Sequence, residues 1–185
     1  MSNYGLDSDK LETVCRVLLK EIGEDIDRPG LKDTPRRFAR WWREFSQYED
    51  NNVETTFAVE HADQMVVVKG MRVWSLCEHH LLPFWCDVSV GYITEENVLG
   101  LSKFARIAHK CAHRLQVQER LVVQIAEEIQ LATACKDVAV IGKGEHLCMT
   151  MRGIKTPSEM ISSVTHGRFR SHPETRAEFL RLAGF

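Results

Sequence analysis

The spacing of apolar residues alternates between helical and strand periods along this chain, and the order of the alternation constrains its fold most strongly. Apolar side chains recur at helical spacing over roughly the first 50 positions, as on one face of a helix. From about residue 53 the pattern changes to short runs rich in β-branched and aromatic residues, which favour strands. We predict strands at 54–59, 65–69, 71–76 and 84–94, helices at 102–114 and 118–134, strands at 137–141, 146–152 and 160–169, and a last helix at 173–184. Strands that flank a helix pair indicate an α+β fold with an antiparallel sheet.

Two helix starts precede the first strand. Asp9 and Glu12 have the spacing of a capping box. Thr34 is followed by proline, which suits the first position of a helix because its amide donor would be unpaired there anyway. The chain has 185 residues, enough for one ordinary domain and a small addition. We therefore expect a helical appendage at 1–52 and a catalytic domain at 53–185.

Charge and composition narrow the class of partner. The formal net charge is −2, which gives the whole chain no reason to bind nucleic acid or an anionic membrane. No apolar run approaches the roughly 20 residues that span a bilayer, and residues 1–10 lack the apolar core of a signal peptide. We therefore expect a cytoplasmic protein, and its six cysteines should be core thiols or metal ligands because that compartment keeps thiols reduced.

Two short clusters combine the residue types that zinc prefers. Cys77 and His80 have the C-x-x-H spacing that lets one turn offer two ligands, and Cys148 lies in a His-x-Cys segment. If that segment is a strand, His146 and Cys148 face the same way. Three protein ligands of the Cys₂His type leave a fourth tetrahedral position open, as in catalytic zinc sites.

The residues alone leave a second interpretation open. A closed structural zinc site results if His79 or His146 is the fourth ligand; otherwise both are available to move protons beside the metal. Cys148 taken alone is typical of a buried core thiol. Three other cysteines lie on apolar sides of predicted helices and are expected in the core: Cys15, Cys111 and Cys135.

The segment at 100–106 has the features of an anion site. Ser102 is predicted to cap the helix that starts there, and Lys103 and Arg106 lie in its first turns. Helix amides and dipole attract anions such as phosphate. Arg152 lies four residues after Cys148 and would share its face in a strand. Basic residues near helix starts are often merely solvated, and that alternative stays open here.

Polar residues also separate the two predicted helices. Gln118 and Glu119 can read the edge of a base, because a carboxylate accepts hydrogen bonds from the N1 and amino donors of guanine. Taken alone, the segment is equally typical of an ordinary polar helix junction.

Together these segments resemble the GTP cyclohydrolase I family, in family order and over almost the whole chain. The matching stretches are GLKDTPRR at 30–37, SLCEHHLLPF at 75–84, GLSK at 100–103, RLQVQERL at 114–121 and HLCMTMRGI at 146–154. The resemblance implies the tunnelling fold, a ββααββ core with an antiparallel sheet and a helix pair. It also implies that GTP and water become 7,8-dihydroneopterin triphosphate and formate, in a homodecamer with active sites between subunits.

The resemblance further implies roles for individual residues. Zinc would bind to Cys77, His80 and Cys148, and zinc-bound hydroxide would attack guanine C8. His79 and His146 would shuttle protons through ring opening, Amadori rearrangement and ring closure. At the remaining family positions, Ser102 would lie near the ribose, and Gln118 and Glu119 would bind the guanine. The triphosphate would be bound by Lys103, Arg106, Arg152, Arg37 and Arg40, with Arg37 and Arg40 coming from a neighbouring subunit.

Three rival functions were weighed. Nucleotide deaminases use H-x-E and P-C-x-x-C signatures, and this sequence has no C-x-x-C. A related tunnelling-fold enzyme acting on a pterin or deazapurine would differ in not releasing formate. A zinc-stabilised binding module or scaffold would have no use for spare histidines beside its metal.

Overall fold

The computed structural model describes residues 7–48, 56–58, 61–95 and 97–185. The chain divides into two compact units, Met1–Tyr48 and Glu49–Phe185. The boundary predicted at residue 52 lies outside the described residues. None of the helices in the described part of the chain is both long enough and apolar enough to cross a membrane.

The first unit is a pair of packed helices, α1 (Ser8–Glu21) and α2 (Thr34–Ser46). The predicted capping box is wrong in its first residue, because the Asp7 carboxylate, not Asp9, accepts from the first free amides of α1. Asp33 is the N-cap of α2, and the proline at its start lies in the first turn, where it removes no helical hydrogen bond. The apolar side of α2 carries four aromatic rings: Phe38, Trp41, Trp42 and Phe45.

The second unit is built on a five-stranded sheet in the order β5-β2-β3-β6-β7. Its strands are β2 (Met65–Cys77), β3 (Pro83–Ile93), β5 (Leu115–Gln116), β6 (Val138–His146) and β7 (Met160–Thr165). The long strands pair antiparallel, but β5 pairs parallel to β2. The α+β prediction therefore holds with a mixed sheet in place of a purely antiparallel one.

Several predicted strand boundaries are corrected by the structure. The two strands predicted at 65–69 and 71–76 form one strand, β2, with an irregularity between Val68 and Met71 where Gly70 takes a φ of 71°. Within the predicted strand at 54–59, positions 54, 55 and 59 lie outside the described residues. The remainder is β1 (Thr56–Ala58), which pairs with β4 (Asn97–Leu99) in a separate two-stranded sheet.

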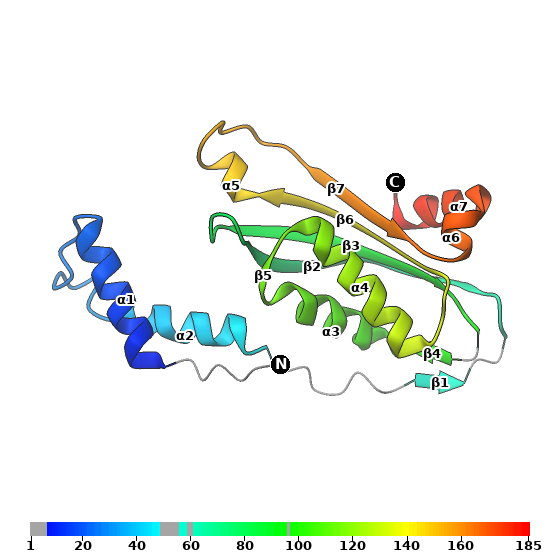
Figure 1. Ribbon diagram of the computed structural model, residues 1–185, viewed down its shortest axis with the longest axis horizontal. Coiled ribbons are helices and arrows are strands. Elements are labelled where there is room, and N and C mark those ends of the chain that lie inside the picture. Colours follow the sequence, from blue (N-terminus) through cyan, green and yellow to red (C-terminus); the bar gives the residue numbers. More distant parts are fainter. Residues whose placement is uncertain (1–6, 49–55, 59–60, 96) are drawn as a thin grey trace. The chain divides into compact units, whose positions relative to one another are not determined.

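Helices cover both faces of the sheet (Figure 1). On one face lie α3 (Leu101–Ala112) and α4 (Gln118–Thr133), and on the other α6 (Arg168–Ser171) and α7 (Pro173–Ala183). Alternate residues of β6 enter the two cores, with Val140 on the α3–α4 side and Ile141 on the α7 side, as the two-residue period of a strand requires. Gly91 of β3 leaves the space into which the Phe179 ring of α7 packs.

The strand predicted at 146–152 is wrong. Strand β6 ends at His146, and the chain then turns into the short helix α5 (Leu147–Thr150). Edge strand β7 pairs with β6 only between Ala139 and Gly144, whereas β3 pairs with β6 as far as His146, which lies opposite Phe84 near the start of β3. The strand predicted at 160–169 likewise ends at Thr165, before α6.

Candidate metal centre

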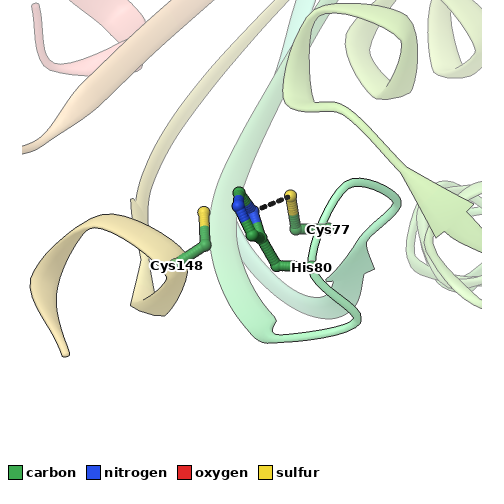
Figure 2. Close-up of side chains that lie close together, drawn as sticks. All are labelled: Cys77, His80 and Cys148. Atoms are coloured by element: carbon green, nitrogen blue, oxygen red, sulfur yellow. Dashed lines mark hydrogen bonds between the residues drawn. The ribbon is translucent and has the colours of Figure 1, made fainter. Parts of the chain in front are cut away.

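Ligand atoms of Cys77, His80 and Cys148 lie within 4.8 Å of one another (Figure 2). Cys77 ends β2, His80 lies in the turn that follows, and Cys148 comes from α5. The Cys77 Sγ to His80 Nδ1 distance is 3.9 Å. A tetrahedral zinc site has a sulfur–nitrogen edge of about 3.6 Å, given Zn–S near 2.3 Å and Zn–N near 2.1 Å. The three side chains therefore form a pocket of the right size for a small dication.

The first two ligands are held by a tight reversal between β2 and β3. The Cys77 carbonyl accepts from the amides of His80 and Leu81, at 3.3 and 2.8 Å, and the Cys77 amide donates to the Leu82 carbonyl at 2.8 Å. Leu81 takes a φ of 55°, a conformation that non-glycine residues adopt rarely. These bonds bring Cys77 and His80 to one side of the turn, so the C-x-x-H spacing acts as the sequence predicts.

The third ligand reaches the pocket by a route that the sequence did not indicate. Cys148 lies in the single helical turn of α5, closed by a bond from the Met151 amide to the Leu147 carbonyl at 3.0 Å. Strand alternation with His146 is therefore not what directs it. Burial, and next the adjacent Cys77 thiol, raises the pKa of Cys148. A dication reverses this preference, because metal ligation requires the thiolate.

The donor set fits zinc with one coordination position left over. Two thiols and one imidazole favour zinc over magnesium or manganese, which prefer oxygen. Among the described residues, no further His, Cys, Asp or Glu joins the group within the same mutual distance. A site with three protein ligands is the arrangement of catalytic zinc rather than of closed structural zinc.

His146 is held on its ring face and at its ring edge. Its ring stacks on that of the buried Phe84, with centroids 4.5 Å apart and planes 7° apart. Its Nε2 lies 3.0 Å from Oε1 of Gln118. Burial lowers the pKa of His146, and the nearby Glu119 carboxylate acts in the opposite direction.

His79 has a different environment, although it lies next to a ligand. The side chain is exposed on the turn, and its Nδ1 lies 3.8 Å from Cys77 Sγ. The turn that holds Cys77 and His80 therefore also sets the position of His79, which lies between them in the sequence.

A network around Arg120, which the sequence does not predict, ties this turn to the helix pair. The Arg120 guanidinium donates to the Glu78 carboxylate, to the Gln116 side chain at 2.8 Å and to the Leu115 carbonyl at 3.1 Å. The hydrogen bond from Arg120 lowers the pKa of the Glu78 carboxyl. The Glu78 amide in turn donates to the Gln116 carbonyl at 3.0 Å. Nothing local in the sequence marks this contact, because 42 positions separate Glu78 from Arg120.

The two residues predicted to read a base differ in accessibility. Glu119 is exposed at the start of α4. Gln118 is fully buried, and its amide nitrogen donates to the Gly142 and Met160 carbonyls, each at 3.0 Å. Only Glu119 presents its side chain to an incoming molecule.

The residues predicted near the ribose and phosphates lie at the opposite end of α3 from the metal ligands. The C-terminal end of α3 is fixed beside the centre, since Ser75 Oγ donates to the Ala112 carbonyl at 2.7 Å and β5 pairs with Cys77. Ser102 lies in the first turn of the same helix, ten residues before Ala112, which is about 15 Å along the axis. Gly100 is the N-cap, and the helix begins at Leu101, so the prediction that Ser102 caps it is wrong. Within one chain, the fold does not bring Ser102, Lys103 or Arg106 to the metal ligands.

The remaining basic residues fall into two groups. Arg152 is exposed just after α5, and its charge acts on the Cys148 thiol. Arg37 and Arg40 are exposed on α2 of the first unit, where they line one surface pocket with Arg36. Arg37 also lies 3.8 Å from the Asp33 carboxylate.

Comparison with known proteins gives one consistent result. The family model described as GTP cyclohydrolase I matches residues 11–184. A relative from Sulfurihydrogenibium sp. named GTP cyclohydrolase 1 is 45% identical, over 96% of this chain and 95% of its own. The protein of that name from Methylococcus capsulatus is 46% identical, over 94% of this chain and 97% of its own. The one from Saccharomyces cerevisiae is 43% identical, over 95% of this chain and 74% of its own.

Proposed function

The chain belongs to the GTP cyclohydrolase I family, and from this premise we propose that it converts GTP and water into 7,8-dihydroneopterin triphosphate and formate. We further propose that its second unit has the tunnelling fold. The order of its long elements, β2, β3, α3, α4, β6 and β7, supports the ββααββ core of that fold. The domain division proposed with it is a helical appendage at 1–52 and a catalytic domain at 53–185.

One observation carries the catalytic assignment. Two segments far apart in the sequence bring two thiols and one imidazole within 4.8 Å of one another, with no fourth protein ligand among the described residues. When bound there, zinc supplies a water of lowered pKa, which is the nucleophile needed at C8 of guanine. Cys77, His80 and Cys148 would hold the ion.

The two histidines beside the ligands move the protons in this proposal. His79, exposed on the turn, protonates N7 as the bond from C8 opens and formate is released. His146 lies next to the ribose and helps its ring to open, before the Amadori rearrangement and closure of the pterin ring. Its lowered pKa favours the neutral imidazole, which can both accept and donate.

Recognition of GTP is divided among the remaining charged residues. The exposed Glu119 carboxylate accepts from the N1 and amino donors of guanine. Arg152, just after α5, lies close enough to the centre to hold a phosphate near it. Ser102 meets the ribose, while Lys103 and Arg106 bind the triphosphate with the amides that start α3.

The separation of these groups supports a site shared between subunits. Because about 15 Å of helix separates Ser102 from the end of α3 that flanks the centre, we infer that another copy of the chain supplies Ser102, Lys103 and Arg106. Arg37 and Arg40 would come from a neighbouring copy as well. The assembly proposed is the homodecamer of the family, acting on a small molecule in the cytoplasm, with neither nucleic acid nor membrane as partner.

The direct test is incubation of zinc-loaded protein with GTP. Formate is assayed together with the fluorescent pterin that forms on oxidation, and a chelator-treated sample is the control. We expect both products in equal amounts, and neither after chelation. Pterin fluorescence without formate from another purine substrate would favour a related enzyme. Folded, zinc-loaded protein that releases neither product would refute the proposed activity.

A further inference from the structure

We infer that Gln118 is a positioning residue for His146: it fixes the plane of the imidazole and accepts a hydrogen bond from Nε2, so that Nδ1 is the ring nitrogen turned away from this bond. This inference rests on the proposed function only for the role of His146 in turnover. It replaces direct recognition of guanine by the Gln118 side chain. Its basis is the set of contacts around one buried amide.

The orientation of the Gln118 amide is determined by its neighbours. Its Nε2 lies 3.0 Å from the Gly142 carbonyl oxygen, 3.0 Å from that of Met160 and 3.1 Å from Ser162 Oγ. Carbonyl oxygens only accept hydrogen bonds. A flipped amide would direct its own oxygen at both carbonyls, so the nitrogen must be the atom that faces them.

The tautomer of His146 follows from this orientation. Oε1 of Gln118 lies 3.0 Å from Nε2 of His146, and an amide oxygen has no hydrogen to donate. Nε2 must therefore carry the proton of this bond, in the neutral ring as in the charged one. Nδ1 is consequently the ring nitrogen that Gln118 does not contact.

Two glycines of β6 allow close packing here: Gly144 borders Gln118 itself, and Gly142 borders its neighbours. A Cβ placed on Gly144 would lie 2.6 Å from Gln118 Oε1, and it would also collide with the Trp85 carbonyl. At Gly142 an added Cβ would meet Cys86 Sγ at 2.7 Å. Gln118 thus lies in a close-packed niche with no exposed surface, and it cannot turn outward to meet a base without losing its hydrogen bonds. Phe84 stacks on His146 at 4.5 Å, so the ring is held at its edge and on its face.

The first experiment separates positioning from recognition. Gln118→Met keeps the length of the side chain and removes both hydrogen-bonding groups. We expect kcat to fall about 10- to 100-fold, the usual effect of losing a group that orients a functional histidine, with KM for GTP and zinc content unchanged. The matched control is Gln130→Met, on the same helix, where the amide donates only to the Lys136 carbonyl at 3.1 Å; it should behave as the wild type. A higher KM with kcat unchanged would mean that Gln118 binds guanine directly, and wild-type kinetics would also overturn the inference.

A second experiment needs no folded variant of Gln118. In zinc-loaded wild-type protein labelled with ¹⁵N-histidine, the His146 signals are identified by their loss in His146→Asn. At a pH where the ring is neutral, we expect Nε2 to be the protonated nitrogen and Nδ1 the bare one. The reverse pattern would overturn the inference whether or not the protein turns over GTP. Failure of the wild type to release formate would refute the proposed function and leave the assigned tautomer standing.

Discussion

The two ends of α3 present opposite kinds of chemistry. At its C-terminal end lie the candidate metal ligands, the hydrogen-bonded pair of the half-buried His146 and the buried Gln118, and the Arg120 network. At its N-terminal end the helix carries Ser102, Lys103 and Arg106 in its first turns. In the function proposed above, one end holds a dication and moves protons, and the other attracts an anion.

The distance between the two ends of α3 explains why their side chains do not meet within one chain. Ten residues of helix, about 15 Å, keep the thiols of one end away from the basic side chains of the other. Within one chain, the candidate metal ligands and the basic residues at the start of α3 therefore lie at different ends of the helix. We infer that a complete site arises when the metal end of one copy meets the anion end of another. The predictions below test this division, starting with the largest expected effect.

Loss of a metal ligand should have the greatest effect. We expect Cys148→Ala to bind no zinc and to turn over GTP no faster than chelated wild type, because two ligands of this type do not retain the ion. As a control, Cys15→Ala removes another buried thiol, in the first unit, and should keep both zinc and activity. Zinc analysis by mass spectrometry and the formate assay give the two readings.

His79 should behave differently from the ligands. His79→Ala is expected to keep one zinc per chain and to lose about 10²- to 10⁴-fold in kcat, the range for a missing general acid. If His79→Ala instead loses its zinc, His79 is the fourth ligand and the site is a closed one.

Mixing a variant that lacks zinc with a variant of weakened GTP binding, both assayed at GTP concentrations well below the wild-type KM, tests whether the ends belong to different subunits. Cys148→Ala loses a metal ligand but keeps the basic residues at the start of α3. Lys103→Met keeps the metal ligands but has weakened binding of phosphate. After they are denatured and refolded together in equal amounts, about a quarter of the sites should combine two intact ends if each site is shared between two copies. Recovery of about a quarter of wild-type activity is expected. No gain over the separately refolded variants would show that each chain uses both of its own ends.

The Lys103 substitution alone should have a smaller effect. Lys103→Met removes one charge-assisted contact to phosphate, and we expect KM for GTP to rise about tenfold, equivalent to about 1.4 kcal/mol. Zinc content should not change, because the metal lies at the other end of the helix. Lys136→Met, an exposed lysine just after α4, is the control for loss of charge.

The smallest effect concerns the network that anchors the metal-binding turn. Hydrogen bonding to Arg120 lowers the pKa of Glu78 below its usual value of 4.5. A depressed carboxyl pKa stabilises the fold above the unfolded pKa, and this stabilisation is lost as pH falls through the folded pKa. Metal-free Glu78→Gln should therefore melt slightly below the wild type at pH 7, and the difference should vanish in acid below pH 4.5. Glu127→Gln on α4 is the control, and a difference independent of pH would contradict this account.

The residue types alone predicted the candidate metal ligands well, because the preference for a metal belongs to each side chain itself. Thiol and imidazole groups in a C-x-x-H turn are few, and their preference for zinc does not depend on the details of packing. The long helices and strands were also predictable, because each repeats its apolar period over many residues. Cys77, His80 and Cys148 are accordingly the three residues that the structure brings together.

The features that could not be predicted depend on contacts between distant segments. Helix α5 spans four residues, too few for a period to identify it, and β5 spans only two. The buried position of Gln118 is set by Gly142 and Gly144, more than 20 residues later in the chain. The sequence marks Gln118 as polar and hence accessible, whereas its burial follows from space that only the folded sheet provides.

The most direct test of the central claim is a zinc titration of activity. Metal-free protein is supplied with increasing zinc, and bound zinc and formate release from GTP are measured on the same samples. A single Cys₂His centre in each chain predicts that activity rises in proportion to bound zinc and stops rising at one ion per chain. Full activity without zinc, or activity that stays absent at one zinc per chain, would contradict it.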